Sequence, residues 1–183
     1  MLTLVIGGAS SGKSAVAEDL VMAVPGRRAY VATMQPFGKQ AEARVARHLK
    51  MRENKGMATI EQYTDLGEIS AKAAEFDVLL IECMTNLAAN EQFSPETAGN
   101  PDIPGKICGD ILKLSEVCVN IVVVSCDLFQ DGNSYPNETM EYMANLGRLN
   151  CLLAEKADRV IEVFYGLIRE LKPFGGEGGA ADK

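Results

Sequence analysis

The residues with the clearest chemical potential form a glycine-rich stretch near the start of the 183-residue chain. The stretch follows an apolar run, precedes a helical pattern and fits G-x-x-x-x-G-K-[ST], the spacing of a phosphate-binding loop. Glycines let successive backbone N–H groups point into one nest, and the start of the next helix adds positive potential. We therefore expect eight residues to bind the phosphates of a nucleotide: Gly7, Gly8, Ala9, Ser10, Ser11, Gly12, Lys13 and Ser14.

Two side chains of this loop carry specific roles. Lys13 is expected to reach the terminal phosphates and act catalytically, and the Ser14 hydroxyl is expected to bind Mg²⁺. A second carboxylate ligand for this ion should follow another apolar strand, and Glu82 and Asp127 both qualify. Its position favours Glu82 as this ligand, and Asp127 is the alternative. The competing interpretation of either residue is a polar side chain that ends a strand.

The only histidine, His48, is the second candidate for catalysis. Arg44, His48 and Arg52 are spaced i, i+4 and i+8, which places them along one face of a helix predicted over 40–53. Neighbouring cations disfavour imidazolium, so a neutral, nucleophilic imidazole is expected near pH 7. Beside phosphate-binding guanidiniums it could attack an α-phosphate. The competing interpretation is an ordinary surface histidine.

Composition excludes several classes of protein. The chain has 18 Lys and Arg against 25 Asp and Glu, a net charge of −7, which argues against binding nucleic acid or anionic lipid over the whole surface. The stretch 27–55 differs, because it contains eight basic and only two acidic residues. Its place after the phosphate-loop pattern predicts a local polyphosphate site.

The five cysteines predict buried, reduced thiols in a cytoplasmic protein, because their number is odd and no CxxC pair occurs. No apolar run approaches the ~20 residues that a membrane span needs. The first residues also lack the basic start and cleavage site of a signal peptide.

Short apolar runs alternate with helical stretches, which predicts a parallel sheet covered on both faces. We expect an α/β fold, a P-loop NTPase-like three-layer sandwich with a mostly parallel sheet and an edge strand near the C-terminus. Residues 1–172 would form one domain, 94–105 a loop and 173–183 a flexible tail. The expected strands are 2–6, 29–33, 78–82, 121–125 and 159–164, and the expected helices are 13–24, 40–53, 65–75, 106–119 and 138–156.

Several short patterns recur in a fixed order over nearly the whole chain. They are the loop GG-x-x-SGKS, Tyr30–Thr33, the R-V-x-x-H-x-x-x-R helix from Arg44 to Arg52, Thr59 with Glu61, Glu82–Thr85 with Asn90, and Gly147 with Asn150. In these patterns the chain resembles the bifunctional adenosylcobinamide kinase / adenosylcobinamide-phosphate guanylyltransferase family of cobalamin biosynthesis.

The resemblance implies a two-stage reaction and a set of site residues. A nucleotide, GTP or ATP, with Mg²⁺ would phosphorylate adenosylcobinamide. GMP would then pass from GTP to His48, releasing pyrophosphate, and from His48 to the corrinoid phosphate. The family also implies a homotrimer. The implied nucleotide contacts beyond the loop are Thr33, Leu49, Lys50, Met51, Arg52, Glu61 and Glu82.

The chain departs from the family pattern at four places. Ser10 replaces an arginine, Met57 replaces a tryptophan, Met143–Ala144 replace an Arg-Asp pair, and the stretch after Cys126 is longer. Two other interpretations therefore stay open: a P-loop kinase of another small alcohol without guanylyl transfer, and a non-catalytic nucleotide-binding homologue.

Overall fold

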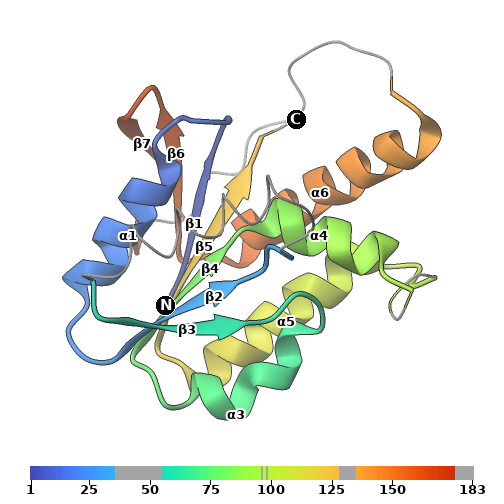
Figure 1. Cartoon of the computed structure of the whole chain (residues 1–183). Coiled ribbons are helices and arrows are strands. Elements are labelled where there is room, and N and C mark those ends of the chain that lie inside the picture. Colours follow the sequence, from blue (N-terminus) through green and yellow to red (C-terminus); the bar gives the residue numbers. More distant parts are fainter. Residues whose placement is uncertain (36–54, 96, 98, 128–134, 176–183) are drawn as a thin grey trace.

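The structure, a computed structural model, describes residues 1–35, 55–95, 97, 99–127 and 135–175. Within this part the chain forms a seven-stranded sheet of order β3-β2-β4-β5-β1-β6-β7 (Figure 1). Strands β1 to β6 are parallel, and β7 runs antiparallel to β6 at the edge. In chain order the strands are Leu2–Gly7, Arg28–Ala32, Met57–Glu61, Val78–Glu82, Asn120–Cys126, Arg159–Phe164 and Leu167–Lys172.

Helices cover both faces of the sheet (Figure 1). Helix α1 packs on one face with Val5, Tyr30 and Leu80, and the other helices pack on the opposite face around Leu4 and Ile81. Alternate residues of the central strands enter the two cores because successive side chains of a strand point to opposite faces. This confirms the predicted three-layer α/β fold. The helices are α1 (Lys13–Ala23), the 3₁₀ helix η1 (Leu66–Ile69), α3 (Ser70–Ala73), α4 (Met84–Phe93), α5 (Ile103–Val117) and α6 (Asn137–Lys156).

Three elements were not predicted by residue range, β3, α4 and β7, although an edge strand near the C-terminus was expected. Strand β3 buries only Ile60 fully and therefore shows no apolar run. The predicted loop 94–105 is wrong at its end, where α5 begins at Ile103. Asp102 caps this helix by accepting a hydrogen bond from the Gly105 N–H at 3.2 Å. Pro104 lies in the first turn, where proline is favoured rather than disruptive.

Other predictions differ in extent or fall outside the described part. The helix predicted over 65–75 is a 3₁₀ turn followed by a short α-helix, spanning 66–73. The helix predicted over 40–53 and most of the predicted tail lie outside the described residues. No helix within the described ranges is long and apolar enough to cross a membrane.

All five cysteines carry free thiols. Cys108 and Cys118 are buried, and burial raises the pKa of both thiols. Cys83 and Cys126 are partly buried, but Cys151 is exposed on α6, so the prediction of a buried thiol is wrong there.

An ionic network around the buried Glu91 joins α4, α5 and the loop after β3. Lys106 on α5 contacts Glu91 at 2.5 Å and Asp65 at 2.7 Å, and the Asp65 N–H also donates to Glu91. Glu91 is only 1% exposed. Burial alone would lower the pKa of Lys106, but the hydrogen bonds to Asp65 and Glu91 raise it overall. The network therefore fixes α4 beside the carboxyl end of the sheet.

Replacing Lys106 by Met should lower the free energy of unfolding by about 3–5 kcal/mol, because Glu91 would stay buried without its cation. Lys113→Met is the matched control, since Lys113 lies on the same helix, pairs with Asp110 and is 65% exposed. It should cost about 1 kcal/mol or less in urea unfolding. Equal losses in both variants would contradict the network's role.

The same network predicts a pH dependence. Because the pKa of Lys106 is raised above 10.5 in the folded state, its contribution is complete below the unfolded pKa and is lost as the pH rises through the folded pKa. The alkaline decline in the urea midpoint should therefore be smaller in Lys106→Met than in the wild type.

Candidate active site

The phosphate loop connects the end of β1 to the start of α1. Gly12 precedes the helix with φ 95°, a left-handed conformation that favours glycine. The Lys13 ammonium folds back over the loop and donates to the Gly8 carbonyl at 2.9 Å. Its side chain is largely buried, so a phosphate bound in the loop would meet a cation already held over it.

Gly7 allows a neighbouring strand to lie against the base of the loop. A Cβ at this position would lie 2.4 Å from the Val163 carbonyl oxygen of β6, a distance at which atoms overlap. The loop therefore lies directly against β6, because Gly7 has no side chain.

Glu82, at the end of β4, is the carboxylate that the fold brings to Ser14. The Ser14 hydroxyl donates to Glu82 Oε1, and the Tyr30 hydroxyl donates to Glu82 Oε2 at 3.2 Å. Ser14 and Glu82 thus present hydroxyl and carboxylate oxygens to each other, the hard donors that Mg²⁺ prefers. The Asp127 backbone instead donates to the Gly7 carbonyl at 3.2 Å.

Thr33 and Glu61 lie at the same edge of the sheet as the loop. Ala32 of β2 pairs with Glu61 of β3 and with Glu82 of β4, so the carboxyl ends of these parallel strands are level. Thr33 is fully buried and its hydroxyl donates to the Cys83 carbonyl at 2.9 Å. Glu61 is exposed and accepts a hydrogen bond from the Tyr63 hydroxyl at 3.0 Å.

Two asparagines on helices hold the strand ends in place. Asn90 of α4 donates to the carbonyls of Thr33, at 2.8 Å, and Tyr63, at 2.9 Å. Asn150 of α6 accepts from the Ser125 hydroxyl at 2.5 Å and donates to the Cys126 carbonyl at 3.1 Å. In the sequence both asparagines stand out only as members of the family patterns, and their contacts with the strand ends were not predicted. Tyr30 also stands in a family pattern, but its contact with Glu82 was not predicted.

The basic stretch 27–55 does not act as one phosphate site in its described part. Arg27 pairs with Glu75 at 3.3 Å, and Arg28 donates to three carbonyls at the end of α1. Arg27 precedes β2 and Arg28 is its first residue, so both lie at the amino edge of the sheet, opposite the loop. Lys55 pairs with the buried Glu18 of α1. For these three cations the predicted polyphosphate role is wrong, because structural partners occupy them.

The predicted nucleophile and its neighbours lie outside the described residues. This holds for His48, Arg44, Leu49, Lys50, Met51 and Arg52.

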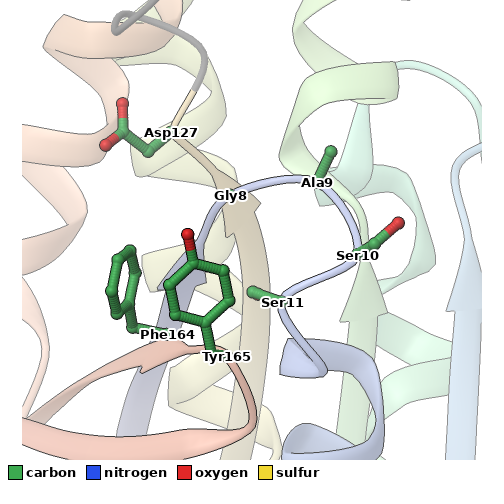
Figure 2. A pocket seen from close by; sticks show the side chains of 7 residues that line it. All are labelled: Gly8, Ala9, Ser10, Ser11, Asp127, Phe164 and Tyr165. Carbon is green, nitrogen blue, oxygen red and sulfur yellow. The ribbon is translucent and has the colours of Figure 1, made fainter.

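A cavity of about 410 Å³ opens beside the phosphate loop (Figure 2). Gly8, Ala9, Ser10 and Ser11 form one wall. Asp127, Phe164 and Tyr165 complete the lining. The cavity lies within the size range of small-molecule sites.

The model of one protein family, described as cobinamide kinase / cobinamide phosphate guanyltransferase, matches residues 3–171. The chain belongs to this family. Proteins named bifunctional adenosylcobalamin biosynthesis protein CobU are similar along their full lengths, at 30% identity in Salmonella typhimurium and 28% in Escherichia coli. A protein named CobP from Pseudomonas aeruginosa is 28% identical over 98% of its length, and each match covers 94% of this chain. The resemblance inferred from the patterns is thereby confirmed.

Replacing Lys13 by Met should raise the Kd for GTP about ten- to hundredfold, because charge-assisted hydrogen bonds contribute ~1.5–3 kcal/mol. The melting temperature should change little, since the hydrogen bond that Lys13 donates to the Gly8 carbonyl lies within the loop itself. Lys72→Met, at an exposed position on α3, is the control and should leave the Kd unchanged. Calorimetric titration with GTP measures the Kd of both variants. An unchanged Kd in Lys13→Met would refute the assignment of Lys13 as a phosphate-binding residue.

Proposed function

We propose that the protein phosphorylates adenosylcobinamide and then transfers GMP from GTP to adenosylcobinamide phosphate. The observation that carries this proposal is the phosphate loop with Ser14 in contact with Glu82, in a chain whose residues 3–171 match the family. The loop supplies a nucleotide phosphate site, and the family match supplies the corrinoid as the acceptor.

In the kinase stage the protein mainly positions the triphosphate and neutralises the negative charge of the phosphoryl group that is transferred. The loop N–H groups hold the triphosphate, and Lys13 stabilises the charge that develops on the transferred phosphoryl group. The hydroxyl of the aminopropanol side chain of adenosylcobinamide is the acceptor. The donor is GTP or ATP.

In the transfer stage His48 is proposed as the nucleophile. Its imidazole nitrogen attacks the α-phosphorus of GTP, and pyrophosphate leaves. The corrinoid phosphate then attacks the same phosphorus and releases His48. The spacing of Arg44, His48 and Arg52 supports this proposal, because guanidiniums on the same face of the helix predicted over 40–53 would hold the phosphates beside the imidazole.

Incubation with GTP and Mg²⁺ should add one GMP unit to the intact protein mass of the wild type and none to His48→Ala. The adduct should be lost in acid, as expected of a phosphoramidate. His48→Ala should still bind GTP, which separates loss of the nucleophile from loss of the site. No mass gain in a wild type that binds GTP would exclude guanylylation and leave a kinase of a small alcohol or a non-catalytic binder, which turnover of adenosylcobinamide distinguishes.

Ser14 and Glu82 are proposed to hold Mg²⁺, because both present oxygen atoms at one point beside the loop. When bound, the ion supplies charge neutralisation to the phosphate oxygens.

Glu82→Gln should therefore weaken GTP binding about tenfold or more with Mg²⁺ present, because a charged ligand is replaced by a neutral amide. With EDTA the Kd should be unchanged or lower, since a carboxylate no longer repels the triphosphate. Tyr30→Phe removes only one hydrogen bond to Glu82 and should cost about threefold. An equal loss with and without Mg²⁺ would contradict the metal role.

The remaining parts of the proposal rest on the sequence patterns. Thr33, Glu61 and the stretch 49–52 are proposed to contact the nucleotide. The protein is proposed to be a cytoplasmic homotrimer with 1–172 as its working domain. Exposed apolar residues on the edge strand β7, among them Leu167 and Ile168, favour contact with another subunit.

A further inference from the structure

The cavity beside the phosphate loop adjoins the place where the terminal phosphate of a bound nucleotide belongs. The lysine of such a loop reaches the β- and γ-phosphates. The Lys13 ammonium donates to the Gly8 carbonyl at 2.9 Å, and Gly8 lines the cavity. The cavity therefore lies at the γ-phosphate end of the loop, where a molecule that accepts this phosphoryl group must bind.

The cavity and the proposed nucleotide contacts lie on different sides of the loop. Thr33 and Glu61 lie at the ends of β2 and β3, which are separated from β1 by β4 and β5. The cavity residues Asp127, Phe164 and Tyr165 come from the ends of β5 and β6, the two strands that flank β1. A nucleotide that extends from the loop toward β2 and β3 leaves the side facing β6 to a second molecule.

Asp127 places a carboxylate in this cavity. The residue directly follows β5, and its backbone N–H donates to the Gly7 carbonyl at 3.2 Å, which fixes it beside the start of the loop. Asp127 is partly buried and borders the same space as Gly8 (Figure 2). A carboxylate repels a phosphate group, but beside one it can accept the proton of an attacking hydroxyl. The position of Asp127 therefore suits the acceptor better than the nucleotide.

Two exposed aromatic rings form another wall of the cavity (Figure 2). Phe164 and Tyr165 are 58% and 84% exposed, and their ring centroids are 4.3 Å apart. The next residue, Gly166, donates its N–H to the Ser11 carbonyl at 2.9 Å, so the turn that carries these rings is held against the loop. Rings of this size gain free energy by burial. Apolar rings beside a carboxylate suit an alcohol whose hydroxyl is attached to a large apolar body.

We propose that this cavity binds the acceptor alcohol of the kinase stage. Asp127 is the base that takes the hydroxyl proton, and Phe164 and Tyr165 contact the apolar part of the acceptor. The inference rests on the proposed function, in which the acceptor is the aminopropanol hydroxyl of adenosylcobinamide. The hydroxyl oxygen forms a bond to the γ-phosphorus while its proton passes to the Asp127 carboxylate. The bond from that phosphorus to the bridging oxygen breaks, and its electron pair leaves with the nucleoside diphosphate.

The two proposed stages allow a selective test of Asp127. Asp127→Asn should lower kcat for phosphorylation of adenosylcobinamide about a hundred- to ten-thousandfold, the usual contribution of a general base. The Kd for GTP should be unchanged or lower, because no contact with the nucleotide is removed. The same variant should still transfer GMP to adenosylcobinamide phosphate supplied directly, because a phosphate oxygen that is already negative needs no base.

Two further variants complete this test. Asp127→Glu keeps a carboxylate and should recover part of the lost kinase rate. Asp19→Asn removes the same charge from an exposed position on α1 and should keep both activities.

Tyr165→Asn tests the aromatic wall. Tyr165 and Gly166 have φ values of 51° and 77°, and Asn-Gly is favoured in hairpin turns with two positive φ values, so the fold should be kept. The KM for adenosylcobinamide should rise about tenfold through lost apolar contact, with the Kd for GTP unchanged. Tyr165→Phe keeps a ring and should retain the wild-type KM.

The other outcomes overturn the inference in recognisable ways. Full kinase activity in Asp127→Asn would exclude Asp127 as the base. Weaker GTP binding in this variant only with Mg²⁺ present would make Asp127 a metal ligand instead. An unchanged KM in Tyr165→Asn with an altered molecular mass in solution would assign the rings to a subunit contact. A wild type that binds GTP but does not phosphorylate adenosylcobinamide would refute the proposed function itself, and the inference with it.

Discussion

The parallel arrangement of β1 to β6 is the constraint on which the rest of the structure depends. Parallel strands place all their carboxyl ends at one edge of the sheet, and the register keeps Ala32, Glu61 and Glu82 level. The phosphate loop leaves β1 at this edge, so Ser14 meets a carboxylate 68 positions away in sequence. The hydroxyl and the carboxylate come together because of strand order, not because of any local pattern.

Side chains from helices on one face of the sheet hold the strand ends at this edge in place. Asn90 binds the carbonyls after β2 and β3, and Asn150 binds the end of β5. The ionic network of Lys106 and Glu91 fixes α4, which carries Asn90. Buried polar groups need partners, so each of these side chains specifies one placement of a strand end.

On the side of β1 that faces β6, glycines without side chains allow the loop to lie close to its neighbours. Gly7 lets the Val163 carbonyl approach, and Gly12 lies against Gly166. These contacts bring the turn with Tyr165 beside the loop. The same closeness that forms the phosphate nest thus places an aromatic wall next to it.

The sequence by itself determined the parts whose chemistry is local. The phosphate loop follows from eight consecutive residues, the α/β class from alternating apolar runs and helices, and the family from ordered motifs. Only the tertiary structure decided that Glu82 rather than Asp127 meets Ser14, that Arg27 and Arg28 serve the opposite edge, and that Tyr165 adjoins the loop. Strand order, register and close backbone approach join residues far apart in the chain, and no spacing along the sequence encodes such contacts.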